Sequence, residues 1–552
     1  MWDKHIATLT SEVERTLSND EALSILVEYK FSKRTYQGIV KVGKENNCKL
    51  YPSYDNVLKA KKRCYPPRTS ITITGSCAEV KLQALLDHTA ERILFLQREV
   101  IGSLAVENAR NIRLICKWGC DGSSGRYKQR LWKSVYKQKF TEGGKSDGNV
   151  YVTSLVPLQL VYKDHISNTE IVVWKNPRPS SSRFCRPIRL HLLLENVESV
   201  LNDVDDIEQQ VESLVPFTTQ VNGMEICVKY NMTFTMIDSK VCSAVPGTKS
   251  AQRCYLCGAT SKEFNNIDEI LQKKVTETNV RFGISMLHAW IRFFECCLHL
   301  SYKLEIKKWQ ANTKREKRIT EDRKKVIQKG FRLQLGLIVD RPIKPGYGST
   351  NDGSTARRFF KNSSISATIT GVSEHLINRF HVILQAISSG HNIKCDKFRE
   401  YALETARKFV ELYPWYDMPT SVHKLLIHGP EIIASALLLP IGQLSEEARN
   451  KNIKKLCKNF SRKCSRDNIQ DVFNQLMVTS DPYISSIRKL PQRPLESLLP
   501  ETIELLESPT AHAAITDEMY TDTSESSESS ETDTHIDIYC DSDTDIDFDF
   551  CP

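Results

Sequence analysis

The stretch that decides the fold class is Ile226-Cys227-Val228-Lys229-Tyr230-Asn231-Met232-Thr233-Phe234-Thr235-Met236, in which large apolar residues stand at every second position. That period predicts a half-buried strand, and we expect its last residues to be Ile237-Asp238. Upstream, similar strand patterns occur from Ile112 to Cys116, at 150–162 and at 171–174, and a helix is expected at about 197–213. Three strands, a helix and a further strand predict a layered α/β domain.

The chain on both sides of this domain has a helical pattern. Residues 1–70 read as helical and basic, and residues 265–475 as mainly helical. The segment 303–332 holds twelve Lys/Arg against four Asp/Glu, and Asn351-Asp352-Gly353 is typical of a turn. The whole chain is therefore expected to be α+β and mainly helical.

Charge is divided unevenly along the 552 residues. The net charge is +9, but residues 501–552 contain sixteen Asp/Glu and no Lys or Arg, so residues 1–500 carry 9 + 16 = +25. A body this basic favours a polyanionic partner, with DNA or RNA the commonest inside a cell, although a solvated basic surface is the alternative. The acidic end is too polar and like-charged to pack, which predicts a disordered tail.

Several classes of protein are disfavoured by composition. No apolar run approaches the roughly 18 residues of a membrane span, so we expect no membrane association. No secretory signal is visible near the start, which favours an intracellular protein. Seventeen cysteines, an odd number, then favour reduced thiols, with metal ligation as the special use of any close pair.

One such pair is Cys254-Tyr255-Leu256-Cys257, and His423 and His428 stand much later in the chain. Two thiolates and two imidazoles have the number and softness for a tetrahedral, structural Zn²⁺ site. The alternative is that the two pairs are unrelated, since about 165 residues separate them.

Three acids could hold a different metal. Asp121 lies in Cys116-Lys117-Trp118-Gly119-Cys120-Asp121-Gly122, and Asp238 ends the strand quoted above. Glu447 follows Ser445, which can cap a helix rich in Lys and Arg. Two carboxylates at neighbouring strand ends and a third from a helix suit a two-metal phosphodiester site. Each acid also has a simpler interpretation, as a turn former or as a partner of a helix dipole.

Together these motifs resemble the catalytic subunit of the V(D)J recombinase and the related Transib transposases, over about residues 30–490. The resemblance is carried by Phe31 to Tyr36, Cys120-Asp121-Gly122, Trp174 to Pro179, Cys185-Arg186-Pro187, Phe234 to Lys240, Cys254 to Cys257, Lys308 to Ala311, Asn351 to Arg358, Pro414-Trp415, His423 to Ile433 and Ser445 to Lys451.

The resemblance implies an RNase H-like core with Asp121, Asp238 and Glu447 as catalytic ligands of two Mg²⁺ or Mn²⁺ ions, and a structural Zn²⁺ on Cys254, Cys257, His423 and His428. It implies metal-dependent nicking, hairpin formation and strand transfer on double-stranded DNA, by a nuclear homodimer that a second recombinase subunit could assist. The implied DNA-binding residues are Lys33, Arg34, Lys308, Arg357, Arg358, Trp415, Arg449, Lys451 and Lys455.

The implied domains follow the motifs. They are a helical dimerisation and DNA-binding region (1–75), a helical connector (76–110), the first part of the core (111–250), a helical zinc-binding insertion (251–435), a C-terminal catalytic helix region (436–490) and a disordered acidic tail (491–552).

The chain departs from the family pattern at Ser445 to Lys451, which is about three residues shorter. Three residues rotate a helix by about 300°, so Glu447 can keep its direction or lose it. From the comparison with the family we also expect most of its long N-terminal zinc-bearing extension and its separate DNA-binding module to be missing. The alternative function is therefore a domesticated, catalytically inactive DNA-binding protein. A third possibility is that the acidic tail recruits chromatin proteins or restrains the basic body in cis.

Overall fold

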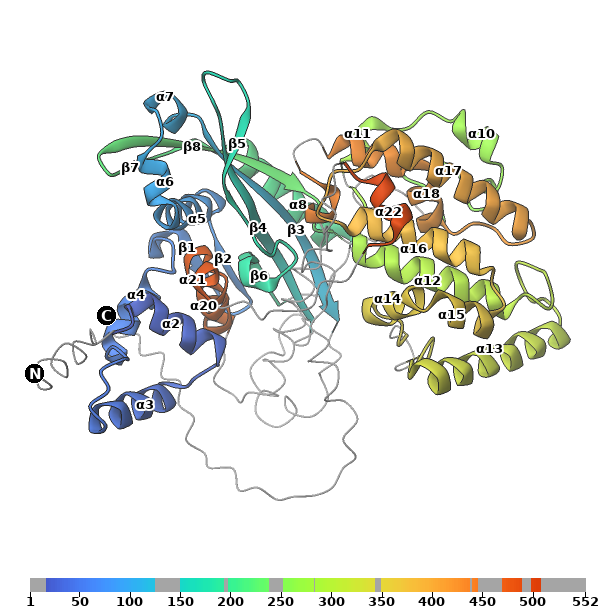
Figure 1. The fold of residues 1–552 in the computed structure, drawn as a ribbon, viewed down its shortest axis with the longest axis horizontal. Coiled ribbons are helices and arrows are strands. Elements are labelled where there is room, and N and C mark those ends of the chain that lie inside the picture. The colour runs from blue at the N-terminus through green and yellow to red at the C-terminus, as the bar shows by residue number, and fades with distance from the viewer. Residues whose placement is uncertain are drawn as a thin grey trace, which may run out of the picture.

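The computed structural model describes residues 16–124, 149–192, 197–237, 252–281, 283–342, 349–436, 439–444, 469–488 and 498–507. Its architecture is mixed α/β and mainly helical, which confirms the predicted class at that level. Figure 1 shows a sheet with most of its helices at the left and a second, helical group at the right. We name these groups the sheet unit (residues 16–237 and 469–488) and the helical unit (residues 252–444 and 498–507).

The sheet unit contains eight described strands and the helices around them. The strands are β1 (Ile71–Ile73), β2 (Cys77–Val80), β3 (Ile112–Ser124), β4 (Asn149–Lys163), β5 (Glu170–Lys175), β6 (Arg186–His191), β7 (Phe217–Val221) and β8 (Met224–Phe234). The helices are α2 (Asn19–Glu28), α3 (Lys33–Glu45), α4 (Tyr54–Lys62), η1 (Arg68–Ser70), α5 (Leu82–Leu96), α6 (Arg98–Gly102), α7 (Val106–Ala109), η2 (Ser182–Phe184), α8 (Val197–Glu212), α20 (Ile469–Thr479) and α21 (Pro482–Ile487).

The helical unit contains α10 (Ile267–Leu271), α11 (Glu277–Val280), α12 (Met286–Tyr302), α13 (Lys314–Leu335), α14 (Gly353–Lys361), α15 (Ser363–Thr370), α16 (Glu374–Ser388), α17 (Cys395–Leu412), α18 (Thr420–Ser435), η3 (Ile441–Leu444) and α22 (Pro500–Leu505). None of the helices in the described ranges combines the length and apolar character that crossing a membrane requires.

The strand order of the sheet is β1-β2-β6-β4-β3-β8-β7, with β5 also paired to β4. Strand β8 runs parallel to β3, with Trp118 opposite Phe234, whereas the other described pairs are antiparallel. Strands β7 and β8 are joined through Asn222-Gly223, both with positive φ, which suits a two-residue hairpin turn. The Trp118 and Phe234 rings lie 4.3 Å apart and are nearly buried in the core.

The parallel strand is shorter than its alternating pattern predicts. Strand β8 ends at Phe234, and the backbone N–H groups of Thr235 and Met236 both donate to the Trp118 carbonyl oxygen. Two donors converging on one acceptor break the regular ladder. Met236 and Ile237 are nevertheless fully buried, so the apolar pattern correctly marked burial but overestimated the strand.

Two predicted boundaries near the N-terminus are wrong. Residues 76–110 are not a purely helical connector, because β2 lies at Cys77–Val80 and pairs with β6, which is more than a hundred residues away. Strand β1 likewise belongs to the sheet rather than to a helical region ending at 75. Short strands of this kind depend on a distant partner, which local periodicity does not report.

The predicted turn at Asn351-Asp352-Gly353 is the start of a helix. The Asp352 side chain accepts a hydrogen bond of 2.8 Å from the Thr355 backbone N–H and caps α14. Asparagine, aspartate and glycine favour helix N-caps as well as turns, so composition alone does not separate the two.

The predicted tail starts too early. Residues 498–507 fold onto the helical unit: Thr502 and Leu506 are fully buried, and Gln385 of α16 accepts hydrogen bonds from the Leu499 N–H and the Thr502 hydroxyl. The backbone of Glu507 donates to the Asn392 carbonyl oxygen at 2.8 Å. The remaining predicted tail, residues 508–552, lies outside the described residues.

Within the sheet unit, a buried ion pair joins α5 to the start of α21, and Asp20 of α2 lies beside it. Arg92 of α5 donates to both carboxylate oxygens of Asp481, at 2.9 and 3.1 Å, and the Asp481 side chain is fully buried. Asp20 of α2 lies 4.0 Å from the same guanidinium. Asp481 also caps α21 by accepting from the Ile484 N–H.

Replacing Asp481 by asparagine is expected to lower the free energy of unfolding by about 3–5 kcal/mol, because Arg92 would keep a buried charge without its main partner. Urea denaturation measures this loss. The matched control is Asp205→Asn at an exposed position of α8, expected to change stability by less than about 0.5 kcal/mol. A loss below about 1 kcal/mol for Asp481→Asn would contradict the role assigned to the pair.

Candidate metal centre and strand edge

A tight turn presents the first two candidate ligands. The Gly258 N–H donates to the Cys254 carbonyl oxygen at 2.8 Å, and the Cys254 N–H donates to Ala259 at 2.9 Å. Gly258 has φ +71°, a conformation that side chains other than glycine rarely adopt. The turn therefore folds back on itself and places the Cys254 and Cys257 sulfurs on the same side.

The other two candidate ligands come from α18. His423 is fully buried and His428 is 3 % exposed. Five residues of α-helix turn through 500°, so the two imidazoles leave the helix about 140° apart. Their ring centroids nevertheless lie 5.1 Å apart in a T-shaped arrangement.

These four residues form a single cluster. One ligand atom from each of Cys254, Cys257, His423 and His428 lies within 4.8 Å of all the others. The Cys257 sulfur is 3.5 Å from Nε2 of His423. The predicted pairing of two motifs that are distant in sequence is thus confirmed as a cluster that could hold a metal such as zinc.

The electrostatics of the cluster suit a metal cation. A hydrogen bond from the Cys257 thiol and neighbouring backbone N–H groups lower the pKa of Cys254 to about 7, whereas the same contact raises the pKa of Cys257. Burial lowers the pKa of His423, which keeps its imidazole neutral at pH 7. One thiolate and a neutral imidazole are forms that bind zinc, and binding expels the remaining thiol proton.

The surroundings of the cluster also fit a structural zinc ion. Phe264 stacks on the His423 ring at 4.0 Å, and Nε2 of His428 is buried with no hydrogen-bond partner among the described residues. A buried imidazole nitrogen without a partner is costly unless a ligand satisfies it. Two sulfurs and two imidazoles favour tetrahedral Zn²⁺, and four protein ligands leave no coordination position for a substrate.

Gly258 and Phe264 were not among the residues predicted for this site. The glycine carried a local signal, because a glycine next to a tight CxxC turn is the residue that adopts a positive φ most readily. No local sequence feature marks Phe264 as part of the site. Its stacking on His423 depends on contacts between positions 159 residues apart.

Only one of the three candidate acids lies in the described residues. Asp121 is half-buried on β3, three residues after Trp118. Asp238 and Glu447 lie outside the described residues, so their distances from Asp121 are not part of the structure. The chain is described up to Ile237, one position before Asp238, and up to Leu444, three positions before Glu447, and both segments contact β3.

The segment before Asp238 crosses β3 at Gly119. A Cβ atom added to Gly119 would lie 2.0 Å from the Met236 carbonyl oxygen, so only glycine permits this approach. The chain that leads to Asp238 therefore rests on β3 two residues before Asp121.

The segment before Glu447 is held to β3 by Lys117. Its ammonium group is fully buried and donates a 2.7 Å hydrogen bond to the carbonyl oxygen of Gln443 in η3. Gly442 packs closely on Ser389, where an added Cβ would lie 2.2 Å from the Ser389 carbonyl oxygen. Leu444, the last described residue of this segment, is three positions before Glu447.

The described candidates for DNA binding divide into exposed and packed side chains. Arg34, Lys308 and Arg358 are exposed, whereas Lys33, Arg357 and Trp415 are half-buried. The Arg357 guanidinium stacks over the Trp290 ring at 5.4 Å, and Trp415 packs edge-on against Tyr416 at 5.7 Å, so both contribute to packing. The last three candidates, Arg449, Lys451 and Lys455, lie outside the described residues.

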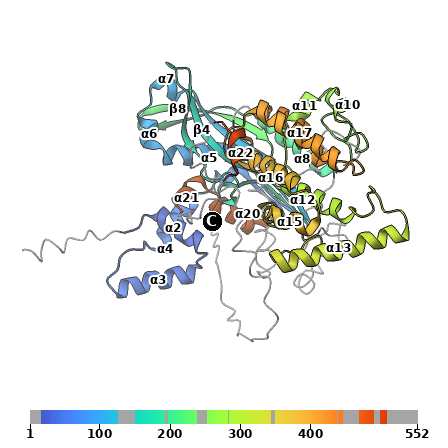
Figure 2. The same ribbon diagram turned by 45° about the vertical axis from the view of Figure 1, so that its right-hand side comes forward.

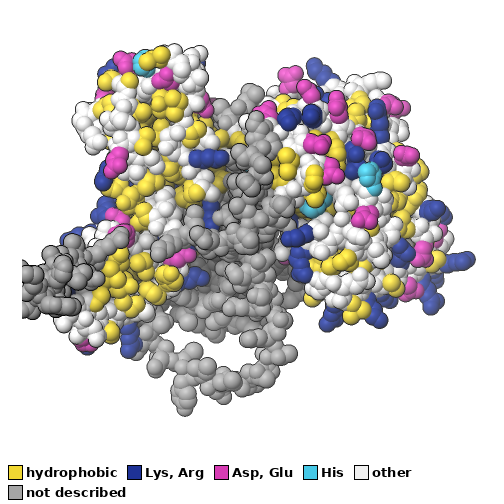
Figure 3. Space-filling view, viewed as in Figure 1, with side chains coloured by type: hydrophobic (Ala, Val, Ile, Leu, Met, Phe, Trp, Pro, Cys, Tyr) yellow, Lys and Arg dark blue, Asp and Glu magenta, His cyan; other side chains and the backbone are white. Residues whose placement is uncertain are grey.

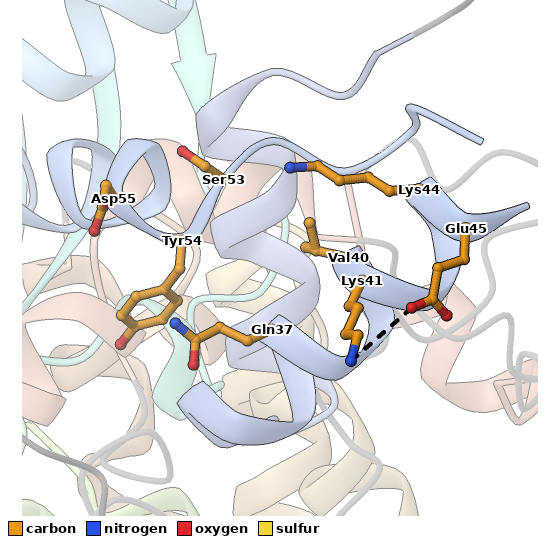
Figure 4. A pocket seen from close by; sticks show the side chains of 8 residues that line it. All are labelled: Gln37, Val40, Lys41, Lys44, Glu45, Ser53, Tyr54 and Asp55. Atoms are coloured by element: carbon orange, nitrogen blue, oxygen red, sulfur yellow. Dashed lines mark ion pairs between the residues drawn. The ribbon is translucent and has the colours of Figure 1, made fainter. Parts of the chain in front are cut away.

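The exposed cations occupy separate surfaces. Figure 3 shows Lys and Arg side chains gathered at the lower right edge, over α13. A shallow hollow on α3 and α4, shown in Figure 4, has Lys41 and Lys44 on one side, but Glu45 and Asp55 also line it. Its mixed charge gives no preference for an anionic ligand.

No family model and no curated protein matches this chain. The function is therefore inferred from the ends of β3 and β8, the cluster of Cys254, Cys257, His423 and His428, and the distribution of charge along the chain.

Proposed function

We propose that this protein is a DNA transposase or recombinase in which Asp121, Asp238 and Glu447 form a metal-dependent active site at one edge of the sheet. The observation that carries the proposal is the parallel pairing of β3 and β8. The carboxyl ends of adjacent parallel strands meet at the same sheet edge, and Asp121 and Asp238 follow the paired residues Trp118 and Phe234 by three and four positions.

The strand pairing also supports an RNase H-like core. Strands β6, β4 and β3 form an antiparallel set, and β8 joins it in parallel at β3. Residues 252–444 of the helical unit lie between β8 and α20 in the sequence, α20 and α21 return to the sheet unit, and α22 then returns to the helical unit. This order agrees with a core divided by a helical, zinc-binding insertion.

In the proposed activity Asp121, Asp238 and Glu447 would hold two Mg²⁺ or Mn²⁺ ions, which would supply activation of the attacking oxygen and stabilisation of the leaving oxygen. Water nicks one strand of double-stranded DNA, and the freed 3′-hydroxyl attacks the opposite strand to leave a hairpin. Strand transfer uses the same site. Lys117 is the residue that positions η3, and with it the segment that leads to Glu447.

The remaining parts have supporting roles in this proposal. The zinc cluster stabilises the helical unit, and exposed cations including Arg34, Lys308 and Arg358 neutralise phosphates. We propose a nuclear homodimer, because the reaction needs two DNA ends, with a second recombinase subunit as a further partner.

The test uses the purified chain with supercoiled plasmid. We expect Mn²⁺-dependent nicking, together with DNA binding whose affinity falls steeply as salt rises, since each neutralised phosphate releases counterions. Salt-sensitive binding without nicking would instead support the alternative, a catalytically inactive DNA-binding protein. Absence of both would reject the proposal.

A further inference from the structure

Helix α13 carries an exposed stripe that nothing in the proposed reaction uses. Positions at i, i+3, i+4 and i+7 share one side of a helix, and the basic members of this stripe are Arg315, Arg318, Lys325, Lys329 and Arg332. Asp322 is an acidic member, 3.9 Å from Arg318 and 3.8 Å from Lys325, and the exposed Glu321 lies beside it, three positions after Arg318 and four before Lys325. We name these residues, with Val326 and Leu333, the outer stripe of α13.

The opposite side of α13 fixes the helix on the helical unit. Ile327 and Phe331 are buried, and the Arg323 guanidinium donates to the carbonyl oxygens of Ser301 and Thr370. The outer stripe therefore faces away from the body, and in Figures 1 and 2 α13 lies at the outer edge of the molecule.

The outer stripe is not a simple phosphate-binding surface, because it includes two large aliphatic side chains. Val326 is 69 % exposed and Leu333 is 73 % exposed, seven positions apart. These aliphatic side chains add no favourable contact to the charged phosphates of a DNA backbone. A partner that combines acidic with apolar groups would satisfy both the cations and the aliphatic side chains.

The chain itself contains such a segment. Residues 508–552 hold thirteen Asp/Glu and no Lys or Arg, and in Asp541 to Phe550 acids stand at every second position. Ile546, Phe548 and Phe550 alternate with the last of these acids. When such a sequence is extended, its acidic and apolar side chains point to opposite sides. On α13, Val326 and Leu333 lie about 100° around the helix from Lys325 and Arg332, so an extended segment lying edge-on along the stripe places its apolar side chains on one flank and its acids on the other.

The start of this segment is anchored on the same unit as α13. Helix α22 packs on α16, and its last turn is tied down by a 2.8 Å hydrogen bond between the Lys394 N–H and the Leu505 carbonyl oxygen. The 45 residues after Glu507 can extend to about 150 Å, whereas the 22-residue α13 is about 33 Å long. A segment tethered in this way reaches effective concentrations in the millimolar range.

We propose that the outer stripe of α13 binds the chain's own segment Asp541–Phe550. The acids of the segment pair with Lys325, Lys329 and Arg332, and its aromatic residues cover Val326 and Leu333. The interaction does not depend on the proposed DNA chemistry, so a negative result for nicking would not contradict it, and its own failure would not contradict the nicking activity.

The first experiment is zero-length carbodiimide crosslinking of the full chain at low salt, read out by mass spectrometry. We expect intramolecular links from Lys325 and Lys329 to the acids between Asp541 and Asp549, at a yield that does not depend on protein concentration. Links spread evenly over the exposed lysines of the protein would overturn the proposal. So would links that form only between two copies of the chain.

The second experiment measures chymotrypsin cleavage after Phe548 and Phe550 in the full chain. Lys329→Glu with Arg332→Glu is expected to accelerate cleavage on the order of tenfold, the factor that corresponds to about 1.4 kcal/mol of lost docking free energy. Lys274→Glu with Lys397→Glu, also exposed on the helical unit, is the matched control and should leave the rate unchanged.

Equal cleavage rates in both double variants would contradict docking on α13. Phe548→Ser with Phe550→Ser provides a complementary change outside the described residues. It should reduce the Lys325 and Lys329 crosslinks several-fold, and unchanged crosslinks would remove the apolar part of the proposal.

Discussion

Replacing Cys254 by serine is expected to release zinc and to unfold much of the helical unit. Structural zinc sites in small domains contribute roughly 10–16 kcal/mol of apparent binding free energy at pH 7, as much as or more than the net stability of most domains. Here the four ligands connect the turn at 254–257 with α18. Without the ion, the buried His423 and His428 would lose their partner.

Metal analysis and thermal unfolding test this expectation. The unaltered chain should contain stoichiometric zinc, and Cys254→Ser or a strong chelator should remove it and lower the unfolding temperature. Cys395→Ser makes the same chemical change at a half-buried thiol outside the cluster and should keep the metal. A zinc-free chain with an unchanged unfolding temperature would show that the cluster does not stabilise the fold through a metal.

Replacing Asp121 by alanine is expected to reduce Mn²⁺-dependent nicking by a factor on the order of 10³, the scale observed when one group of a preorganised charge-stabilising site is removed. Asp121 is half-buried near the end of β3, where a missing carboxylate leaves no cavity in the core. DNA binding should persist, because the phosphate contacts come from cations elsewhere. The measurement is the single-turnover nicking rate at saturating protein.

Asp205→Ala on α8 is the matched control, since it also removes one carboxylate but from an exposed helix position. It should nick at the rate of the unaltered chain. If Asp121→Ala nicks as fast as this control, Asp121 is not a catalytic ligand, even if some other residue supports cleavage.

Local sequence patterns predicted which helices and strands form better than they predicted the residues at which those elements begin and end. The alternation from Ile226 correctly marked β8 and its burial, because side-chain period is a property of the strand itself. The end of β8 was wrong, because it depends on the two N–H groups that converge on Trp118. The start of the tail was wrong for a similar reason, since α22 is stabilised by Gln385 and the 389–394 loop rather than by its own composition.

The sequence by itself determined the ligand chemistry of the metal cluster, the basic body and the acidic end, because residue type and spacing carry that information locally. Only the tertiary structure decided that Cys257 meets His423 across 166 positions, that Gly119 must admit the Met236 backbone, and that the cations of α13 share a stripe with Val326 and Leu333. These features arise from the packing of distant segments, whose contacts depend on the shape of the whole chain.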